Sequence, residues 1–211
     1  MNRRLLPYGE TAVLVEFDDP DDAVGLARAL GRLRLPRVVD LVPGATTLLV
    51  RLDAPPTDAL VDALRTTAVE APDATTERVI EVSVHYDGED LADVASLLGL
   101  TTQDLVSRHT ASTWHVQFLG FAPGFAYLTS PDAGLDVPRR ASPRSRVPAG
   151  SVALAGTWSG VYPRDSPGGW QLIGRTDFVA FDPGRVPAVG WRAGDRVRFV
   201  DADRPEPADV R

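Results

Sequence analysis

The sequence predicts an α+β protein of two parts, a small two-layer unit followed by a compact β-barrel. Up to residue 84, apolar residues recur at the spacings of strands and of helices in turn. From Val116 onward the chain holds only short apolar runs broken by glycine and proline, which is typical of a small barrel. A length of 211 residues is sufficient for two small domains.

The first unit is expected to contain six elements. Asp19-Pro20 gives the first helix an N-cap followed by proline, and Pro43-Gly44 suits a tight turn between two strands. The elements are a strand at 12–17, a helix at 19–34, strands at 38–42 and 46–52, a helix at about 60–68 and a strand at 79–84. This βαββαβ order is that of a ferredoxin-like sandwich, so we expect a domain at 1–84 that serves as scaffold or interaction surface.

The second domain is expected at 85–200, with two short helices leading into the barrel. Leu91, Val94 and Leu98 share one face of the first helix, and Thr101 with Asp104 forms a capping box that opens the second. The barrel strands are expected in the runs VQFL, SVALAG, WQLIGR, FVAFD and DRVRFV. The last residues, 201–211, lack apolar periodicity and are expected to form a flexible tail.

Composition excludes several classes of function. No apolar run reaches the length of a membrane span, and Met1 leads into a strand-like segment without a signal stretch, so we expect a cytoplasmic protein without a membrane partner. There is no cysteine, and all 22 basic residues are arginine, which excludes thiolate sites, a Schiff-base lysine and the lysine of a phosphate loop. A net charge of −7 argues against nucleic acid as a partner.

The three histidines, His85, His109 and His115, do not stand at metal-ligand spacing, so no metal is expected on this chain. His109 is expected to pack on its helix and His115 to begin a strand. A role as general base is the alternative for either residue.

Arginines gather in one part of this acidic chain. Six of them lie between Arg139 and Arg175 against one acid, Asp165, which is a local net charge of +5. Such a cluster indicates contact with an anionic ligand or with the acidic face of a partner. The alternative is a solvated rim of arginines around ordinary barrel loops.

Three segments could carry chemistry, each with a plainer alternative. Residues 120–127 hold two glycines, a proline and three aromatics, which could present ring faces or plug the barrel mouth. Pro148–Ser151 could aim backbone amides at an anion or form a simple turn. Tyr162–Trp170 is a loop constrained by two prolines and Gly-Gly that carries a phenol, a guanidinium, a carboxylate and a hydroxyl.

Known catalytic signatures are missing. The sequence holds no G-x-S-x-G, no H-E-x-x-H and no G-x-x-x-x-G-K-[ST]. Because no self-contained catalytic set is visible, we expect this chain to carry half of a site.

The motifs GFAPGFAYL, RVPAGSV, GVYPRDSPGGWQLIGRT and GDRVRF resemble those of the 5-oxoprolinase B-subunit family, also known as allophanate hydrolase subunit 1 and as KipI. The resemblance covers essentially the whole chain and extends to the carboxyltransferase domain of urea carboxylase. It implies an N-terminal α+β domain and a cyclophilin-like C-terminal barrel. It also implies a partner with a related barrel, the C-subunit or KipA-type protein, possibly with a third A-subunit, and a ligand site where the two barrels meet.

The resemblance further implies site residues, carried over position by position. The implied catalytic residues are Arg175, Ser151, Tyr162 and Ser166. The implied substrate-binding residues are Phe121, Pro123, Gly124, Phe125, Pro148, Gly150, Arg164, Gly168, Gly169 and Trp170, with Pro163 beside them. This chain departs from the family at Thr157–Val161, where relatives often have Asn-Gln-Thr-Gly-Ile, and the indole of Trp158 there bears on pocket size.

By this resemblance, the assembled complex uses ATP to open the lactam of 5-oxo-L-proline, with the ATP site on this chain left open. Arg175 and Arg164 are expected to contact anions, the amides of Gly150 and Ser151 to serve an oxyanion, and Tyr162 and Ser166 to orient the substrate. The alternatives are a KipI-type inhibitor that binds a sensor histidine kinase and an allophanate- or urea-type amidohydrolase subunit.

Overall fold

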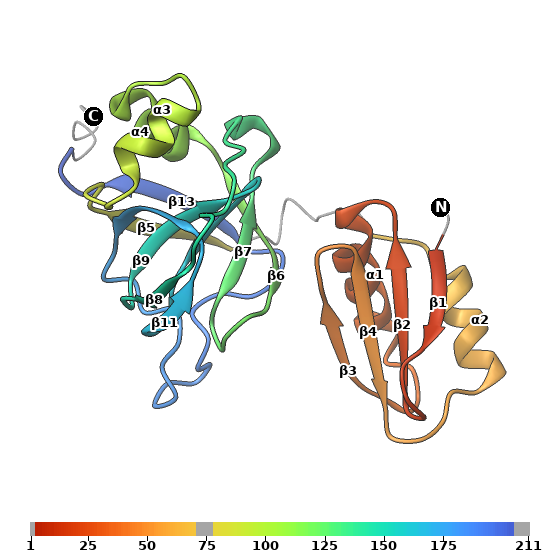
Figure 1. Cartoon of the computed structure of the whole chain (residues 1–211). Helices are drawn as coiled ribbons and strands as arrows, with labels where there is room; N and C mark the ends of the chain where they lie inside the picture. Colours follow the sequence, from red (N-terminus) through yellow and green to blue (C-terminus); the bar gives the residue numbers. More distant parts are fainter. Residues whose placement is uncertain (1–2, 71–77, 205–211) are drawn as a thin grey trace, which may run out of the picture. The chain divides into compact units, whose positions relative to one another are not determined.

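A computed structural model describes residues 3–70 and 78–204, which fall into two compact units, Met1–Thr76 and Glu77–Arg211 (Figure 1). Each unit has an apolar core of its own. Most of the tail expected to be flexible, 205–211, lies outside the described residues. Neither in 3–70 nor in 78–204 is any helix long and apolar enough to cross a membrane.

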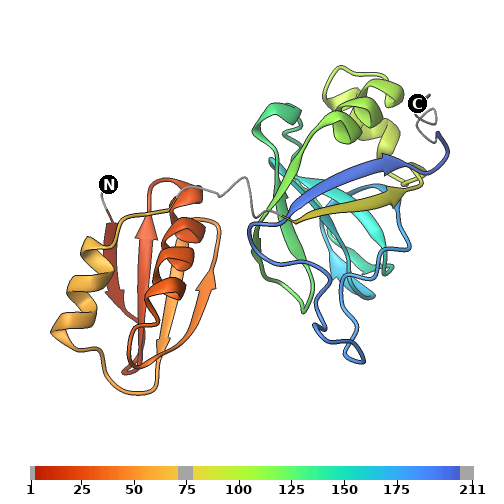
Figure 2. The ribbon, with the colours of Figure 1, turned by 180° about the vertical axis from the view of Figure 1, so that it is seen from behind.

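The first unit is a four-stranded antiparallel sheet with the order β1-β2-β4-β3. Its elements are β1 (Arg3–Pro7), β2 (Ala12–Phe17), α1 (Pro20–Leu33), β3 (Val38–Pro43), β4 (Thr47–Leu52) and α2 (Asp58–Thr66). Both helices cover the same face of the sheet (Figure 2). Leu26 of α1 and Leu64 of α2 pack there against alternate apolar residues of β2 and β4, which share that face because strand side chains alternate.

The expected βαββαβ order was wrong in its last strand. Val79–Val84, here β5, pairs in parallel with β13 (Arg196–Asp201) of the second unit. The edge of the first sheet beside β2 is filled instead by β1, which was not predicted because Arg3–Pro7 shows no clear alternation and ends in proline. The first unit therefore reads ββαββα, and the boundary expected at 84 falls before Glu77.

The second unit is built on a seven-stranded sheet with the order β12-β9-β10-β7-β6-β13-β5. The other elements of this unit are α3 (Leu91–Leu97), α4 (Thr102–Ala111), β6 (Trp114–Leu119), β7 (Ala126–Thr129), the 3₁₀ turn η1 (Pro131–Ala133), β8 (Arg144–Val147), β9 (Ser151–Ala155), β10 (Trp158–Val161), β11 (Ser166–Gly168) and β12 (Gln171–Arg175). Four of the five expected barrel runs are strands. The fifth, Phe178–Asp182, forms a single bridge from Phe181 to Val189.

The sheet curls into a nearly closed barrel. Its two ends, β12 and β5, meet where His85 bridges Arg175 and where the amide of Asp90 donates to the carbonyl of Leu172. We call this contact of 85–90 with 172–175 the barrel seam. A side chain at Gly88 would collide with the backbone of β12, so the close approach at the seam requires glycine.

The two helices expected before the barrel are present and close one part of its core. The capping box of Thr101 and Asp104 is formed as predicted, with both reciprocal hydrogen bonds. Val94 of α3 and Leu105 of α4 are fully buried against the barrel interior together with Trp114 and Phe199.

Candidate functional site

The motif segments, far apart in the sequence, meet in one apolar cluster that is separate from the barrel interior. Its buried members include Phe125, Val147, Tyr162 and Trp170. They lie over Ala153 of β9, and the small β8–β11 ribbon brings two of the segments together. We call this cluster and the loops around it the motif site.

Aromatic rings form a continuous network at the motif site. Phe125 lies at its centre, with ring centroids 5.3 Å from Tyr162 and 5.2 Å from Trp170. Tyr127, 5.2 Å from Phe125, extends the network to partly buried Phe118 and Trp158. Edge-to-face geometry prevails, and each such pair contributes about 1 kcal/mol beyond the area that it buries.

The loop at 120–125 serves both of the roles that its sequence left open. Phe125 is 1 % exposed and acts as a plug, whereas Phe121 is 58 % exposed and presents its ring to solvent. Hydrogen bonds from Ala122 N to Gly120 O and from Phe125 N to Ala122 O hold the loop tight. Phe121 has a φ of 65°, so its backbone is held in a conformation that is uncommon for a non-glycine residue.

The loop at 162–170 is fixed by Asp165 at one point and by Tyr162 at another. The carboxylate of Asp165 accepts from Ala149 N at 2.9 Å and from Arg146 Nε at 2.8 Å, and these contacts lower its pKa. Burial raises the pKa of the Tyr162 phenol, whose oxygen accepts from the amide of Trp170. Gly168 leaves the space that this hydroxyl occupies.

The arginine cluster is largely neutralised from within the chain, which was not predicted. Arg140 and Arg144 both bind Asp90, and Arg144 also reaches Glu89. Arg146 pairs with Asp165, and Arg175 pairs with Asp87 at 2.8 Å. Within 3–70 and 78–204, only Arg139 and Arg164 of the six lack an acidic partner. The cluster is therefore a smaller source of positive potential than its sequence indicates.

Asp90 is the functional-site residue that sequence reasoning missed. Its side chain is 4 % exposed and accepts from Arg140 Nη1 at 2.7 Å, from both Nη atoms of Arg144 at 2.9 Å and from Leu172 N at 2.7 Å. These bonds hold its pKa below the usual range in spite of burial. No local pattern connects it to arginines 50 or more residues later; the only signal was the acidic run at 87–90.

The expected oxyanion donors are not free. The amide of Gly150 donates to Tyr162 O at 2.8 Å, and that of Ser151 donates to Pro148 O at 3.3 Å. Gly150, with a φ of 79°, lies so close to Thr176 O that a side chain would collide with it. The Pro148–Ser151 segment is thus the tight turn that was its plainer alternative, and the oxyanion assignment is corrected.

The structure gathers most of the expected site residues and separates one. Phe121, Phe125, Tyr162, Gly168 and Trp170 belong to the ring network or touch it. Exposed or half-exposed residues surround them: Pro123, Pro148, Pro163, Arg164, Ser166 and Gly169. Arg175, whose expected role was anion binding, lies at the barrel seam with its Nε on Asp87.

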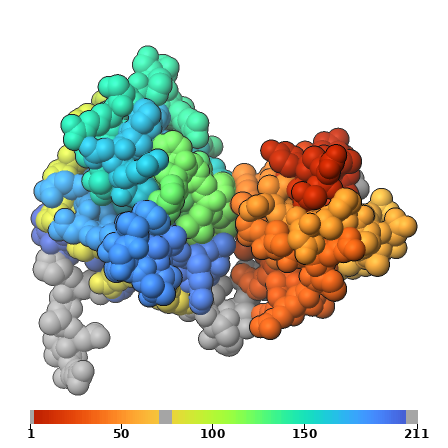
Figure 3. Space-filling view, turned by 90° about the horizontal axis from the view of Figure 1, so that it is seen from below, coloured from red at the N-terminus to blue at the C-terminus, as the bar shows by residue number. Residues whose placement is uncertain are grey.

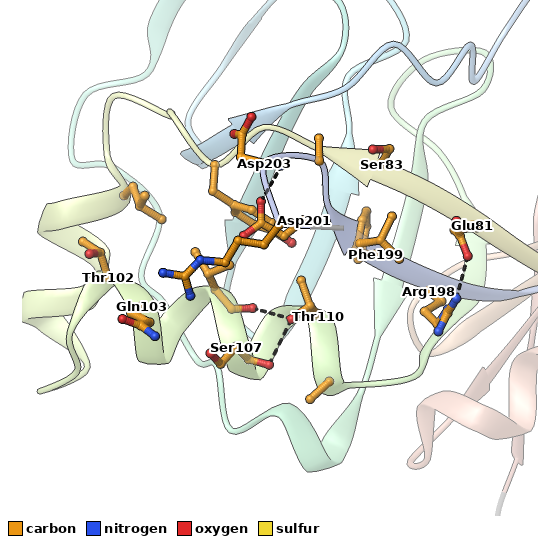
Figure 4. Close-up of a pocket in the computed structure, with 17 residues that line it drawn as sticks. Glu81, Ser83, Thr102, Gln103, Ser107, Thr110, Arg198, Phe199, Asp201 and Asp203 are labelled. Atoms are coloured by element: carbon orange, nitrogen blue, oxygen red, sulfur yellow. Dashed lines mark hydrogen bonds and ion pairs between the residues drawn. The ribbon is translucent and has the colours of Figure 1, made fainter. Parts of the chain in front are cut away.

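A second feature, an open hollow of about 880 Å³, lies between α4 and the strands β5 and β13 (Figure 4). Its lining is mainly polar, with Thr102, Gln103 and Ser107 on the helix and the ion pair of Arg198 with Glu81 on the strands. None of the expected site residues lines this hollow. The hydroxyl-rich face of α4 was its only signal in the sequence.

Behind this hollow lies a buried polar chain. Tyr86 Oη is 2.7 Å from His109 Nδ1, and His109 Nε2 is 2.9 Å from Ser159 Oγ. Burial lowers the pKa of His109 to about 3, and its ring stacks on Phe199. His109 therefore packs as expected. His115 lies in β6, and His85 pairs with Asp203.

In the part of the chain that the structure describes, no group of three or more histidines and carboxylates could hold a metal ion. The chemistry of the motif site therefore has to be derived from rings, guanidinium groups, hydroxyls and backbone.

A nearly closed barrel with motif loops gathered at one cluster, joined to a separate two-layer unit, defines a carboxyltransferase-type protein. The same fold occurs in the urea amidolyase of Kluyveromyces lactis, with a TM-score of 0.72 over 94 % of this chain and 15 % of that one, at 18 % identity. The chain belongs to the family described as carboxyltransferase domain, subdomain C and D, which matches residues 3–191. The resemblance inferred from the motifs is thereby confirmed.

Individual relatives are also similar to this chain. It is 43 % identical over 202 residues to the 5-oxoprolinase B-subunit of Escherichia coli O157:H7, which covers 91 % of this chain and 93 % of that protein. The protein of the same name from Bacillus subtilis (strain 168) is 45 % identical over 126 residues, 58 % of this chain and 52 % of that protein. The solved structure of TTHA0988 matches with a TM-score of 0.78 at 37 % identity, over 94 % of this chain but only 41 % of that longer chain.

Proposed function

We propose that this chain is one component of a heteromeric, ATP-dependent hydrolase that opens the lactam of 5-oxo-L-proline to give L-glutamate. One observation carries the proposal: a protein named as the B-subunit of 5-oxoprolinase matches this chain over nearly its full length, and the motif segments converge on one site. Two further relatives bear the same name, so the kinase-inhibitor and allophanate alternatives are not favoured.

The reaction sets clear demands on the site. An amide carbonyl resists attack by water, so transfer of the γ-phosphoryl group of ATP to the lactam oxygen creates a better electrophile. Water then adds to that carbon, the C–N bond breaks, and glutamate, ADP and phosphate leave. The site has to hold anions and exclude bulk water, which are tasks for guanidinium groups and aromatic walls.

The motif site offers part of what this reaction needs. Arg164 and Arg139 are the guanidinium groups that we assign to the carboxylate or phosphate, since Arg175 is occupied by Asp87. Phe121 supplies an apolar wall beside the ring, and Tyr162 and Ser166 orient the substrate. Ser166 Oγ donates to Arg164 O at 3.3 Å, a weak bond that a substrate oxygen can replace.

The remaining groups come from other chains in this proposal. The partner carries a related barrel, as in the C-subunit or KipA-type proteins, and a third A-subunit completes the complex. We further propose that the barrel of this chain is of the cyclophilin-like type and that the ligand lies between the two barrels. ATP contacts are assigned mainly to the partner, because the Gly150 and Ser151 amides are occupied within this chain.

Arg164→Ala in the assembled complex tests the residue roles. We expect turnover of 5-oxoproline to fall at least tenfold while the complex remains assembled, because an exposed anion contact is lost without any core packing. Arg65→Ala, an exposed arginine of α2 in the other unit, is the matched control and should leave turnover unchanged. Equal activity of Arg164→Ala and wild type would remove Arg164 from the site.

The substrate is tested separately by comparing amides. The assembled wild-type complex should release ADP with 5-oxoproline and not with urea or allophanate. Preferential ADP release with allophanate would transfer the chain to the amidohydrolase alternative, in which the indole of Trp158 shapes a different pocket.

A further inference from the structure

A protruding hairpin at 180–190, the blue loop below the barrel in Figure 1, has a shape fixed by its own hydrogen bonds. Gly190 N donates to Ala180 O at 2.9 Å, and Asp182 N donates to Ala188 O at 2.8 Å. At the tip, Gly184 N donates to the Asp182 carboxylate at 2.9 Å. The hairpin is thus preorganised without any support at its tip.

The base of this hairpin is fastened to the loop at 120–125. Trp191, buried in the barrel, donates from Nε1 to Gly124 O at 2.8 Å. A side chain at Gly124 would lie 2.6 Å from Phe181 Cβ and 2.7 Å from Ala180 O, so only glycine permits this contact. Seen from below, the green and blue segments lie side by side (Figure 3).

These two segments expose apolar side chains on a rigid support. Val186 is 101 % exposed, Phe121 58 % and Val179 49 %. They are three of the five exposed large apolar residues described in this unit, the others being Val79 and Leu97. Together with exposed Pro123 and Pro187 they form what we call the apolar loop surface. Such clustering marks a contact surface, because scattered exposed residues are normal and grouped ones are not.

The charge at the hairpin tip is turned inward. Arg185 Nη2 donates to Val179 O at 2.9 Å, and its Nε pairs with Asp182 at 3.3 Å. The tip therefore presents valine and proline and no free ion, which fits the apolar surface of a protein and neither a nucleic acid nor a charged headgroup.

We propose that the apolar loop surface is where the partner docks, as a separate polypeptide with a complementary apolar surface. Two observations favour this occupant over a second copy of the chain. In TTHA0988 the same fold makes up only 41 % of the chain, so it occurs there joined to further polypeptide. Phe121 also contacts Tyr162, with ring centroids 6.1 Å apart, so a partner seated here reaches the motif site.

The proposal rests on the proposed function and is tested on binding. Val186→Asp in the full chain is titrated by calorimetry against the purified C-type partner. Val186 makes no packing contact that folding needs, and an unchanged melting curve confirms this. We expect Kd to rise at least tenfold, because a charge would be buried at the interface. Leu97→Asp, on exposed Leu97 of α3, is the matched control and should bind as wild type.

Turnover gives an independent readout. The concentration of the variant needed for half-maximal glutamate release should rise by the same factor, with kcat at saturation unchanged. Wild-type affinity of Val186→Asp, or equal weakening by Leu97→Asp, would overturn the proposal. So would a wild-type self-association that Val186→Asp abolishes, since the occupant would then be a second copy.

The two proposals fail in different ways. Partner binding that depends on Val186, without any turnover of 5-oxoproline, would contradict the function and leave the docking surface in place. Normal turnover with unimpaired assembly of Val186→Asp would contradict only the docking surface. A wild-type chain that fails to bind the C-type partner at all would overturn both.

Discussion

Asp90 is the single side chain on which the arrangement of the motif site depends most. It joins α3 to two arginines near β8 and to the backbone of β12. Asp90→Ala would leave Arg144, 16 % exposed, without its main counter-charge. We expect the free energy of unfolding to fall by about 3 kcal/mol, measured by urea denaturation. Asp93→Ala, an exposed acid on the same helix, should change it by less than about 0.5 kcal/mol. A similar loss in both variants would show that Asp90 has no special role.

His109 makes folding stability depend on pH. Its pKa is lowered to about 3 in the folded chain, against about 6.5 when unfolded. Between these values the unfolded state binds more protons, so the stability is complete above about pH 6.5 and falls as the pH drops. The slope reaches about 1.4 kcal/mol per pH unit. Urea denaturation of wild type and His109→Gln between about pH 5 and 7.5 measures it. Parallel curves for the two proteins would contradict the burial of a neutral imidazole.

At the scale of elements, the contact between the 120–125 loop and the hairpin depends on Gly124. Gly124→Ala places a methyl group against Ala180 and Phe181 at a φ of 80°. We expect a loss of about 2 kcal/mol, seen as a lower midpoint of thermal unfolding. Gly31→Ala, in α1 with nothing within 4 Å, should stabilise by up to about 1 kcal/mol. Destabilisation by Gly31→Ala alone would contradict the expectation at both positions.

The sequence predicted helices and most strands because their signals are local. Asp19-Pro20 and the Thr101–Asp104 box each specify a helix start within four residues, and both helices begin there. The partner of β5 could not be predicted, because its parallel pairing with β13 joins residues that lie 117 positions apart, Arg196 with Val79 among them. A strand's apolar pattern shows that it is paired, not with which strand.

The motif site was predicted in its membership and not in its electrostatics. Rings and glycines at 120–127 and 162–170 indicated a constrained site, and they do converge. The arginine count was misleading, because the acids that neutralise the cluster stand at 87–90, on the other side of the barrel seam. Likewise, the Gly150 amide could be judged free only as long as its bond to Tyr162 O was unknown.

At the scale of the whole molecule, two units with separate cores leave one incomplete site. The described residues supply rings, two unpaired arginines and hydroxyls, and no nucleophile with an adjacent base was found in the motif site. We therefore expect the isolated chain to release no glutamate from 5-oxoproline and ATP. A coupled glutamate assay checks this, and turnover by the chain alone would show that its site is complete.

The central claim is that this chain is an essential component of the hydrolase. The measurement that tests it most directly is glutamate and ADP release from 5-oxoproline plus ATP, by this chain reconstituted with its partners and by the same mixture without it. We predict coupled, equimolar release that disappears when the chain is omitted. Absence of release from a fully assembled complex, or equal release without this chain, would contradict the claim.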